Sequence, residues 1–372
     1  MKMLCWPVQN LKEKLKNIYK KYYLFILLPF IFNLINNCRN SDELDLMGPE
    51  LLWNKWQNET FMELMFNEPV EKIDRLSVIS LYAKSDNLQF IYKESIENEF
   101  VSIHINNLKP GLILQISGHA IDRKNNAQVF NIITPSSNPE PAIVCLNEIR
   151  IKSNKKNPDM IEMKVISPGI KNIGSLGLLF GGRDFAGSIG IFPGLDVKKD
   201  DWILVSFKRP LQDEENTDGN FIFLKHKKAM ENQKVHVFDL VCKNHLANST
   251  GAVIIYNTAV NFAANPIVDS IIYADISKKQ DDFNNEPQKY LRWQNYYSKL
   301  FSRFFRFHAW NGLENEILWE CLVDSTYSTI TRTICRRADS QDTDSKNDWH
   351  VVPTRMSTFA GSNSNLVHNP NK

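Results

Sequence analysis

The stretch LNEIRIKSNKKNPDMIEMKV, residues 146–165, decides the fold class of the C-terminal half of the chain. Two short apolar runs flank the polar segment KSNKKNPD, which predicts two strands joined by a turn. Glu148, Asp159 and Glu162 interrupt the apolar pattern. Two carboxylates at a controlled separation can act as a general acid and a general base. No nucleophile motif or positioned histidine lies nearby in the sequence, so we expect structural roles for these acids, against Arg150, Arg332 or Arg336 or toward turn backbone.

The segments that follow are also short and β-rich. They are GSLGLLF (174–180), GSIGIFPGLDVKKDDWILVSFKR (187–209), KVHVFDLV (234–241), GAVIIYN (251–257) and PIVDSIIYAD (266–275). This succession predicts an all-β sandwich or barrel. It contains neither a glycine-rich phosphate loop that opens a helix nor a G-x-S-x-G motif, which argues against the common α/β enzyme folds.

The region before this half shows the same strand chemistry. Apolar and polar residues alternate from Phe61, and the pattern returns at intervals of about 10 to 15 residues, which is typical of a β-sandwich. His104 and His119 lie within these strand patterns, and we expect them to be structural rather than metal ligands. The stretch TPSSNPEPA, residues 134–142, holds three prolines and no hydrophobic period, which predicts an interdomain linker.

Two family resemblances extend this interpretation. LMFNEPV (64–70) and NNLKPGLILQISGHAIDRKNNA (106–127) resemble bacterial Ig-like domains related to fibronectin type III. The opening stretch, FPGLDVKKDDWILVSF (192–207), GAVIIYN, IVDSIIYAD and the closing TRTICRRADSQDTDSKNDW (331–349) resemble, in this order, the lamin-tail domain. The second resemblance covers about residues 141–363 and implies an Ig-like fold. It implies structural motif roles for Asn147, Glu148, Asp159, Glu162, Asp269, Arg332, Asp348 and Trp349.

The N-terminus has the layout of an export signal. Residues 22–35, YYLFILLPFIFNLI, form an apolar run of 14 residues after a lysine-rich segment, which is short for a membrane span and typical of a secretory signal. LINNC, residues 34–38, resembles a bacterial lipobox with Cys38 as the lipidated residue, although Asn37 stands where a small residue is usual. We expect lipidation of Cys38; the alternative is an uncleaved signal anchor in which Cys38 is incidental.

Together these features predict an all-β chain with two Ig-like β-sandwiches in tandem and an N-terminal signal helix. The predicted divisions are a lipoprotein signal peptide (1–37), a lipidated cysteine and tether (38–57), a bacterial Ig-like domain (58–134), a linker (135–141), a lamin-tail-like domain (142–364) and a disordered tail (365–372).

An aromatic segment at about 278–320 exceeds the lamin-tail core. Its aromatic residues recur at spacings of three and four with arginines and lysine interleaved, which predicts an amphipathic helix or helical hairpin. It would contact a membrane surface, form a partner-binding groove, or seal the sandwich core with its aromatics.

Two further sites each admit two interpretations. Asp342, Asp344 and Asp348 have a spacing that can collect oxygen ligands for calcium, but the glycine and glutamate of an EF-hand are missing, and a polar turn is the alternative. Cys321 and Cys335 are the first disulfide pair to test, with buried free thiols as the alternative. The remaining cysteines show no zinc-ligand spacing, so we expect no metal centre and no cofactor other than a possible calcium.

Charge limits the partners. The whole chain carries +2, but the first 37 residues hold six lysines and one acid, and subtracting this +5 leaves −3 on the remainder. A slightly acidic body argues against nucleic acid as a partner. We therefore expect a non-catalytic lipoprotein of the bacterial cell envelope, on the outer membrane or the periplasmic face, which binds or scaffolds an unknown protein or polysaccharide. The alternatives are a surface adhesin for host matrix or polysaccharide and a secreted hydrolase acting on phosphoesters or glycans.

Overall fold

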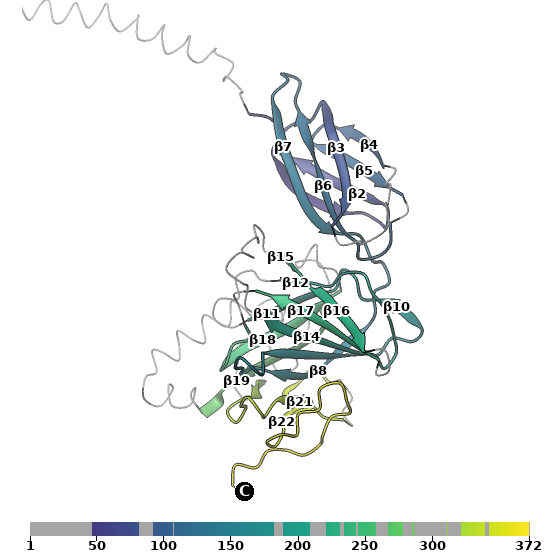
Figure 1. Ribbon diagram of the computed structural model, residues 1–372. Helices are drawn as coiled ribbons and strands as arrows, with labels where there is room; N and C mark the ends of the chain where they lie inside the picture. Colours follow the sequence, from purple (N-terminus) through teal and green to yellow (C-terminus); the bar gives the residue numbers. More distant parts are fainter. Residues whose placement is uncertain are drawn as a thin grey trace, which may run out of the picture.

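The computed structural model describes residues 47–81, 92–106, 108–181, 189–208, 221–230, 234–242, 245–257, 267–277, 285, 310, 321–338 and 342–371. This part of the chain is all-β, as the sequence predicted, and it forms two successive bodies (Figure 1). The predicted signal helix, Cys38 and almost all of the 278–320 insertion lie outside the described residues. Within the described residues no helix has the length and apolar character needed to cross a membrane.

The first body is a β-sandwich. Its strands are β1 (Leu51–Trp56), β2 (Phe61–Phe66), β3 (Lys72–Ser80), β4 (Tyr92–Glu97), β5 (Phe100–Ile105), β6 (Ile113–Ile121) and β7 (Ala127–Pro135). One sheet has the order β1-β2-β5-β4 and the other β3-β6-β7, all antiparallel. Strand β2 illustrates how the strands pack. Met62, Leu64 and Phe66 are fully buried while the residues between them are half-buried, so one face of the pleat lies against the core.

The first strand begins earlier than the sequence indicated. Residues 51–56, which we assigned to the tether, pair with β2, and the indole Nε1 of Trp56 donates a hydrogen bond to Pro135 O at 2.7 Å. The strand lies at the edge of its sheet and leaves Leu52 and Trp53 exposed. An edge strand of this kind lacks the alternation on which the sequence prediction relied.

The second body is a larger sandwich. Its strands are β8 (Val144–Arg150), β9 (Met160–Val165), β10 (Ile170–Asn172), β11 (Gly177–Gly181), β12 (Ile189–Ile191), β13 (Asp196–Lys198), β14 (Trp202–Lys208), β15 (Phe221–Phe223), β16 (Lys225–Met230), β17 (Val235–Val241), β18 (Thr250–Tyr256), β19 (Ile267–Ala274), β20 (Val323–Asp324), β21 (Ile334–Arg336) and β22 (Trp349–Val351). A short 3-10 turn, η2 (Lys346–Asp348), precedes β22.

Two mixed sheets build this sandwich. One has the order β16-β17-β14-β9-β8-β21-β22 and the other β15-β12-β11-β18-β19-β20, and β10 and β13 form a separate ribbon. Strands β14 and β17 run parallel, as do β12 and β15, and β19 and β20. A single apolar core lies between the sheets, and β18 is buried along its whole length, as its continuous apolar sequence favours. Trp310 of the insertion belongs to this core and donates from Nε1 to Cys321 O at 2.8 Å.

The C-terminal end forms hydrogen bonds to the second sandwich, including residues that we expected to belong to a disordered tail at 365–372. Residues 353–371, which we call the C-terminal segment, contain no strand, yet His368 N donates to Val351 O at 2.8 Å and Asn365 Oδ1 accepts from Ala338 N at 2.9 Å. The C terminus lies at the end of the second sandwich that is remote from the first (Figure 1). The segment is polar and contains prolines, and its sequence alone does not indicate these hydrogen bonds, because their partners lie far away in the sequence.

Candidate functional site

The two glutamates of the opening stretch lie side by side on the outer face of the larger sheet. Ile149 and Ile161 pair in register across β8 and β9 and are fully buried in the core. Glu148 and Glu162 are the adjacent pair in register, so the pleat turns them to the opposite face. Both have no exposed surface because the C-terminal segment covers them.

Glu148 is saturated with donors from the same chain. Its Oε1 accepts from Thr333 Oγ1 at 2.5 Å and Ser357 Oγ at 2.7 Å, and its Oε2 accepts from Thr358 N and Thr358 Oγ1, both at 3.0 Å. A carboxylate that accepts several hydrogen bonds is stabilised as an anchor for the groups that donate to it. Through these hydrogen bonds Glu148, which belongs to β8, holds two residues of the C-terminal segment, Ser357 and Thr358, and also Thr333, the residue before β21.

Glu162 fixes the next turn of the same segment. Its Oε1 accepts from Asn147 Nδ2 at 2.5 Å, and its Oε2 accepts from Ala360 N. Burial raises the pKa of Glu162 to about 8, partly opposed by these two hydrogen bonds, and the neighbouring Glu148 raises it further. Asn147 occupies the bulge between Leu146 and Glu148, where β8 and β9 shift register.

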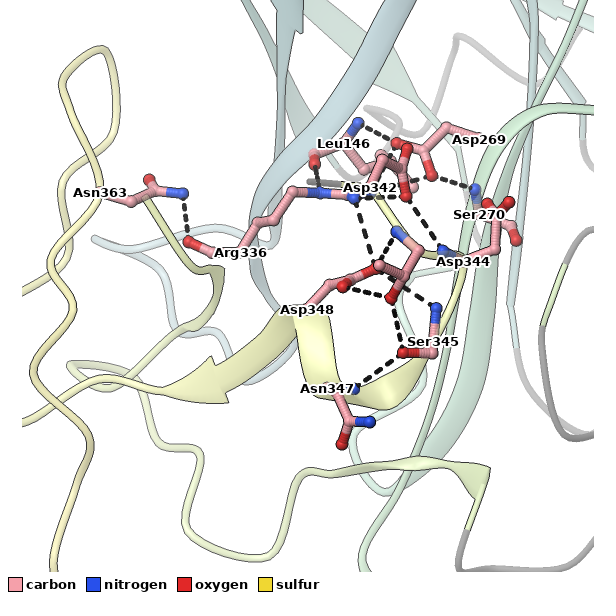
Figure 2. Close-up of polar contacts among 11 residues, drawn as sticks. Leu146, Asp269, Ser270, Arg336, Asp342, Asp344, Ser345, Asn347, Asp348 and Asn363 are labelled. Atoms are coloured by element: carbon pink, nitrogen blue, oxygen red, sulfur yellow. Dashed lines mark hydrogen bonds and ion pairs between the residues drawn. The ribbon is translucent and has the colours of Figure 1, made fainter. Parts of the chain in front are cut away.

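A second polar centre surrounds Arg336 of β21 (Figure 2). Its Nε donates to Leu146 O at 2.8 Å, and its Nη2 donates to both carboxylate oxygens of Asp269, at 3.0 and 2.8 Å. Asp269 also accepts from the backbone N of Leu146 and of Ser270, both at 2.6 Å. Because Asp269 belongs to β19 and Arg336 to β21, this pair ties the two sheets together.

The loop 342–348 closes over the same arginine. Arg336 Nη1 lies 2.7 Å from Asp342 Oδ1 and 3.8 Å from Asp348 Oδ2, and the guanidinium stacks 4.7 Å from the centre of the Trp349 ring. Asp348 also forms a capping box with Ser345 and accepts from Thr343 N at 2.9 Å. The structure thus places Asp348 and Trp349 as supports of Arg336 and of the loop.

Electrostatics at this centre follow from burial. Burial raises the pKa of Asp269 to about 7, opposed by the charge of Arg336. Burial works against the charge of Arg336, but Asp269 and Asp342 outweigh it and raise the pKa of Arg336 above its ordinary value. The guanidinium is therefore the permanent cation of the cluster.

The structure brings together a different set of candidate calcium ligands from the one that the sequence indicated. Asp269, Asp342 and Asp344 offer carboxylate oxygens within 4.8 Å of one another, whereas Asp348 points to its own loop and to Arg336. This set is the place in the described residues where a hard cation would find oxygen donors. The ion pair with Arg336 already engages two of the three carboxylates.

The remaining predicted anchors are dispersed. Asp159 is buried beside His245, with 3.6 Å between Oδ2 and Nδ1, and burial raises its pKa to about 6. Arg332 does not contact the glutamates; its Nη1 lies 2.7 Å from His368 Nε2 in the C-terminal segment. Arg150 places its guanidinium 4.8 Å from the centre of the Phe359 ring.

Of the two interpretations of Cys321 and Cys335, the structure favours separate thiols. No disulfide joins the described cysteines Cys145, Cys242, Cys321 and Cys335. Cys335 pairs in register with Glu148 on the outer face, where its Sγ lies 3.9 Å from Thr358 Oγ1, while Cys321 packs against the core. Burial raises the pKa of Cys335 above its ordinary range and that of Cys145 to about 11, which keeps both as unreactive thiols at neutral pH.

Sequence reasoning missed two central residues. Arg336 was one of three possible partners for the glutamates, but it binds Asp269 instead, and Asn363 was not singled out at all. Asn363 Nδ2 donates to Arg336 O at 2.6 Å and to Asn147 Oδ1 at 2.8 Å, so it joins the two polar centres. A polar residue in a turn gives no signal of this kind, because its partners lie up to 216 residues away.

Comparison with known proteins identifies the second sandwich. Residues 142–351, more than half of the chain, match the model of the family TP_1001_2nd, described as a protein second domain. No curated protein matches the chain. The matched region begins two residues before β8 and ends with β22, so it contains both sheets of the second sandwich and leaves out the C-terminal segment.

Proposed function

The chain belongs to the TP_1001_2nd family through residues 142–351, and from this premise we propose that it is a membrane-anchored, non-catalytic envelope lipoprotein that binds or scaffolds another molecule. A family defined as a second domain fits a chain in which one folded module precedes another. The anchor in this proposal is Cys38, after the apolar run 22–35. The partner is a protein or a polysaccharide.

One observation carries the non-catalytic part of the proposal. Glu148 and Glu162, the best carboxylate pair in the sequence, have no exposed surface, and groups of the same chain donate to all four of their carboxylate oxygens. A general base must reach the proton it removes, directly or through a water molecule. An enclosed and saturated pair suits an anchoring role better than a hydrolytic one.

The finer family assignment is also a proposal. We infer that the second sandwich is lamin-tail-like and that the first is an Ig-like module related to fibronectin type III. Support comes from the shared task of the motif residues: Asn147, Glu148 and Glu162 hold the closing segment, while Asp269, Asp348 and Trp349 surround Arg336. Residues from the opening, middle and closing blocks of the resemblance thus meet in space.

Metabolic labelling tests the anchor. Cells expressing the chain would be grown with labelled palmitate, and the label on the wild-type protein would be compared with the label on a Cys38→Ala variant. We expect the variant to lose the label. A Cys5→Ala variant, changed at the other cysteine of the N-terminal region, is the matched control and should keep it. Equal labelling of wild type and Cys38→Ala would remove the lipoprotein proposal.

A further inference from the structure

Three glycines from three loops meet where the two sandwiches join. A Cβ atom on Gly111, in the turn before β6, would lie 2.3 Å from the Cα of Gly174 and 2.9 Å from the Cα of Gly194. A Cβ on Gly194 would lie 2.4 Å from Pro110 O. These are backbone atoms that cannot rotate away, so this approach of one sandwich to the other requires glycine at the contact.

Hydrogen bonds cross the same contact. Gly194 N donates to Gly111 O at 2.9 Å. Ser136, the first residue after β7, donates from N to Leu112 O and from Oγ to Lys109 O, both at 2.7 Å, and its carbonyl accepts from Ser175 Oγ at 2.6 Å. The connecting segment is therefore bonded to both sandwiches at one residue.

The rest of the connection is equally fixed. Asn138 Nδ2 donates to Asn172 O at 2.9 Å and to Gly174 O at 2.7 Å. Ser136 and Asn138 are 0% and 2% exposed. Ile113, which belongs to β6 of the first sandwich, packs in the core of the second. In a flexible linker the backbone is solvated and the two ends can reorient freely. The burial and hydrogen bonds of Ser136 and Asn138 are inconsistent with both properties.

We propose that the two sandwiches move as one rigid body and that the glycine joint, formed by Gly111, Gly174 and Gly194, holds the second sandwich at a fixed angle to the first. Domains of one chain ordinarily move relative to each other unless a substantial interface prevents it. The inference deepens the proposed scaffold function and rests on it for its biological meaning: a rigid body holds the C-terminal segment at a fixed distance and angle from the first sandwich.

Hydrogen exchange measured by mass spectrometry on the full chain in detergent tests the joint. The readout is the exchange of peptides containing the amides of Leu112, Ser136 and Gly194, which donate hydrogen bonds at the joint. The variant is Gly111→Ala. Gly169→Ala is its matched control, because Gly169 has φ +74 against φ +72 for Gly111, but a Cβ on Gly169 would have no atom within 4 Å. Both substitutions place a side chain at a positive φ and so carry the same backbone strain. Only the Cβ at residue 111 would contact the second sandwich.

We expect slow exchange at these amides in the wild type and in Gly169→Ala, and exchange that is faster by roughly tenfold or more in Gly111→Ala. Fast exchange in the wild type, or equal exchange in the two variants, would overturn the proposal. If Gly111→Ala does not fold, Asn138→Ala replaces it, because it deletes the two hydrogen bonds from the connecting segment to Asn172 O and Gly174 O of the second sandwich, and the exchange is judged by the same criteria. The palmitate experiment is read independently, so a failure of the anchor and a failure of the joint remain distinguishable.

Discussion

Asn147 and Asn363 exchange hydrogen bonds through both of their side-chain amides. Asn147 Nδ2 donates to Asn363 Oδ1 at 2.7 Å, and Asn363 Nδ2 donates to Asn147 Oδ1 at 2.8 Å. The first residue lies in the bulge of β8 and the second in the C-terminal segment. This reciprocal pair is the point at which the carboxylate centre of Glu162 and the centre of Arg336 meet.

Replacing Asn363 with alanine should loosen the C-terminal segment. The change removes the donors to Asn147 Oδ1 and Arg336 O and leaves buried acceptors without them, which costs about 1–3 kcal/mol per unsatisfied group. Chemical denaturation should show that loss in the free energy of unfolding. Asn369→Ala, in the same segment, should change it by less than about 0.5 kcal/mol. Equal effects of the two changes would contradict the role of Asn363.

Replacing Arg336 should lower the free energy of unfolding more than any other single substitution among these contacts. Arg336→Ala leaves the buried Asp269 without the Nη2 group that donates to both of its carboxylate oxygens, and removal of one member of a buried ion pair costs about 3–5 kcal/mol. Arg336→Lys should recover only part of the loss, because an ammonium cannot reproduce the fork that reaches both Leu146 O and Asp269.

The neighbouring arginine provides the control for this comparison. Arg337 is exposed, and Arg337→Ala should shift the melting temperature far less than Arg336→Ala. If Arg336→Lys were as stable as the wild type, the fork formed by Nε and Nη2 would make no contribution to stability and a point charge would suffice.

Glu162 should make the protein less stable as the pH rises. Its folded pKa, about 8, lies above the ordinary value of 4.5, so the folded state binds the proton more tightly than the unfolded state. Between these two values the unfolded chain holds fewer protons, and the free energy of unfolding falls with increasing pH. Asp269 and Asp159, with pKa values raised to about 7 and about 6, contribute in the same direction over lower windows.

Glu162→Gln isolates this contribution. Glutamine can still accept from Ala360 N but does not ionise, so the variant should lose less stability than the wild type between pH 5 and pH 8, by on the order of 1 kcal/mol per pH unit at most. Urea denaturation at a series of pH values measures the two slopes. Identical slopes for wild type and Glu162→Gln would show that Glu162 is ionised throughout.

The parts of this protein that sequence predicted are those governed by local pattern. Alternation found strands such as β2, and the apolar run at β18 found a central strand, because each depends on which face meets the core. For the opening acids we expected either pairing with arginine or contacts to turn backbone, and Glu148 accepts from Thr358 N and Glu162 from Ala360 N. The pairing of Asp269 with Arg336 depends on how two sheets are laid together, and the burial of Ser136 and Asn138 depends on where the second sandwich comes to rest. Neither relationship has a periodic signature.

Asp344→Asn distinguishes an internal ion-pair cluster from a calcium site. Asp344 lies near Asp342 and adopts φ 50, a conformation that asparagine tolerates as well as aspartate. Burial and the charge of Asp342 raise its pKa, so removing its charge should relieve repulsion and raise stability, by at most about 1 kcal/mol because solvent screens a partly exposed group. Thermal unfolding with a chelator and with millimolar calcium measures both effects. With Arg336 as the resident cation, we expect the wild type to melt at the same temperature in both media. A calcium-dependent rise in melting temperature that Asp344→Asn abolishes would instead assign the carboxylates of Asp269, Asp342 and Asp344 to a metal ion.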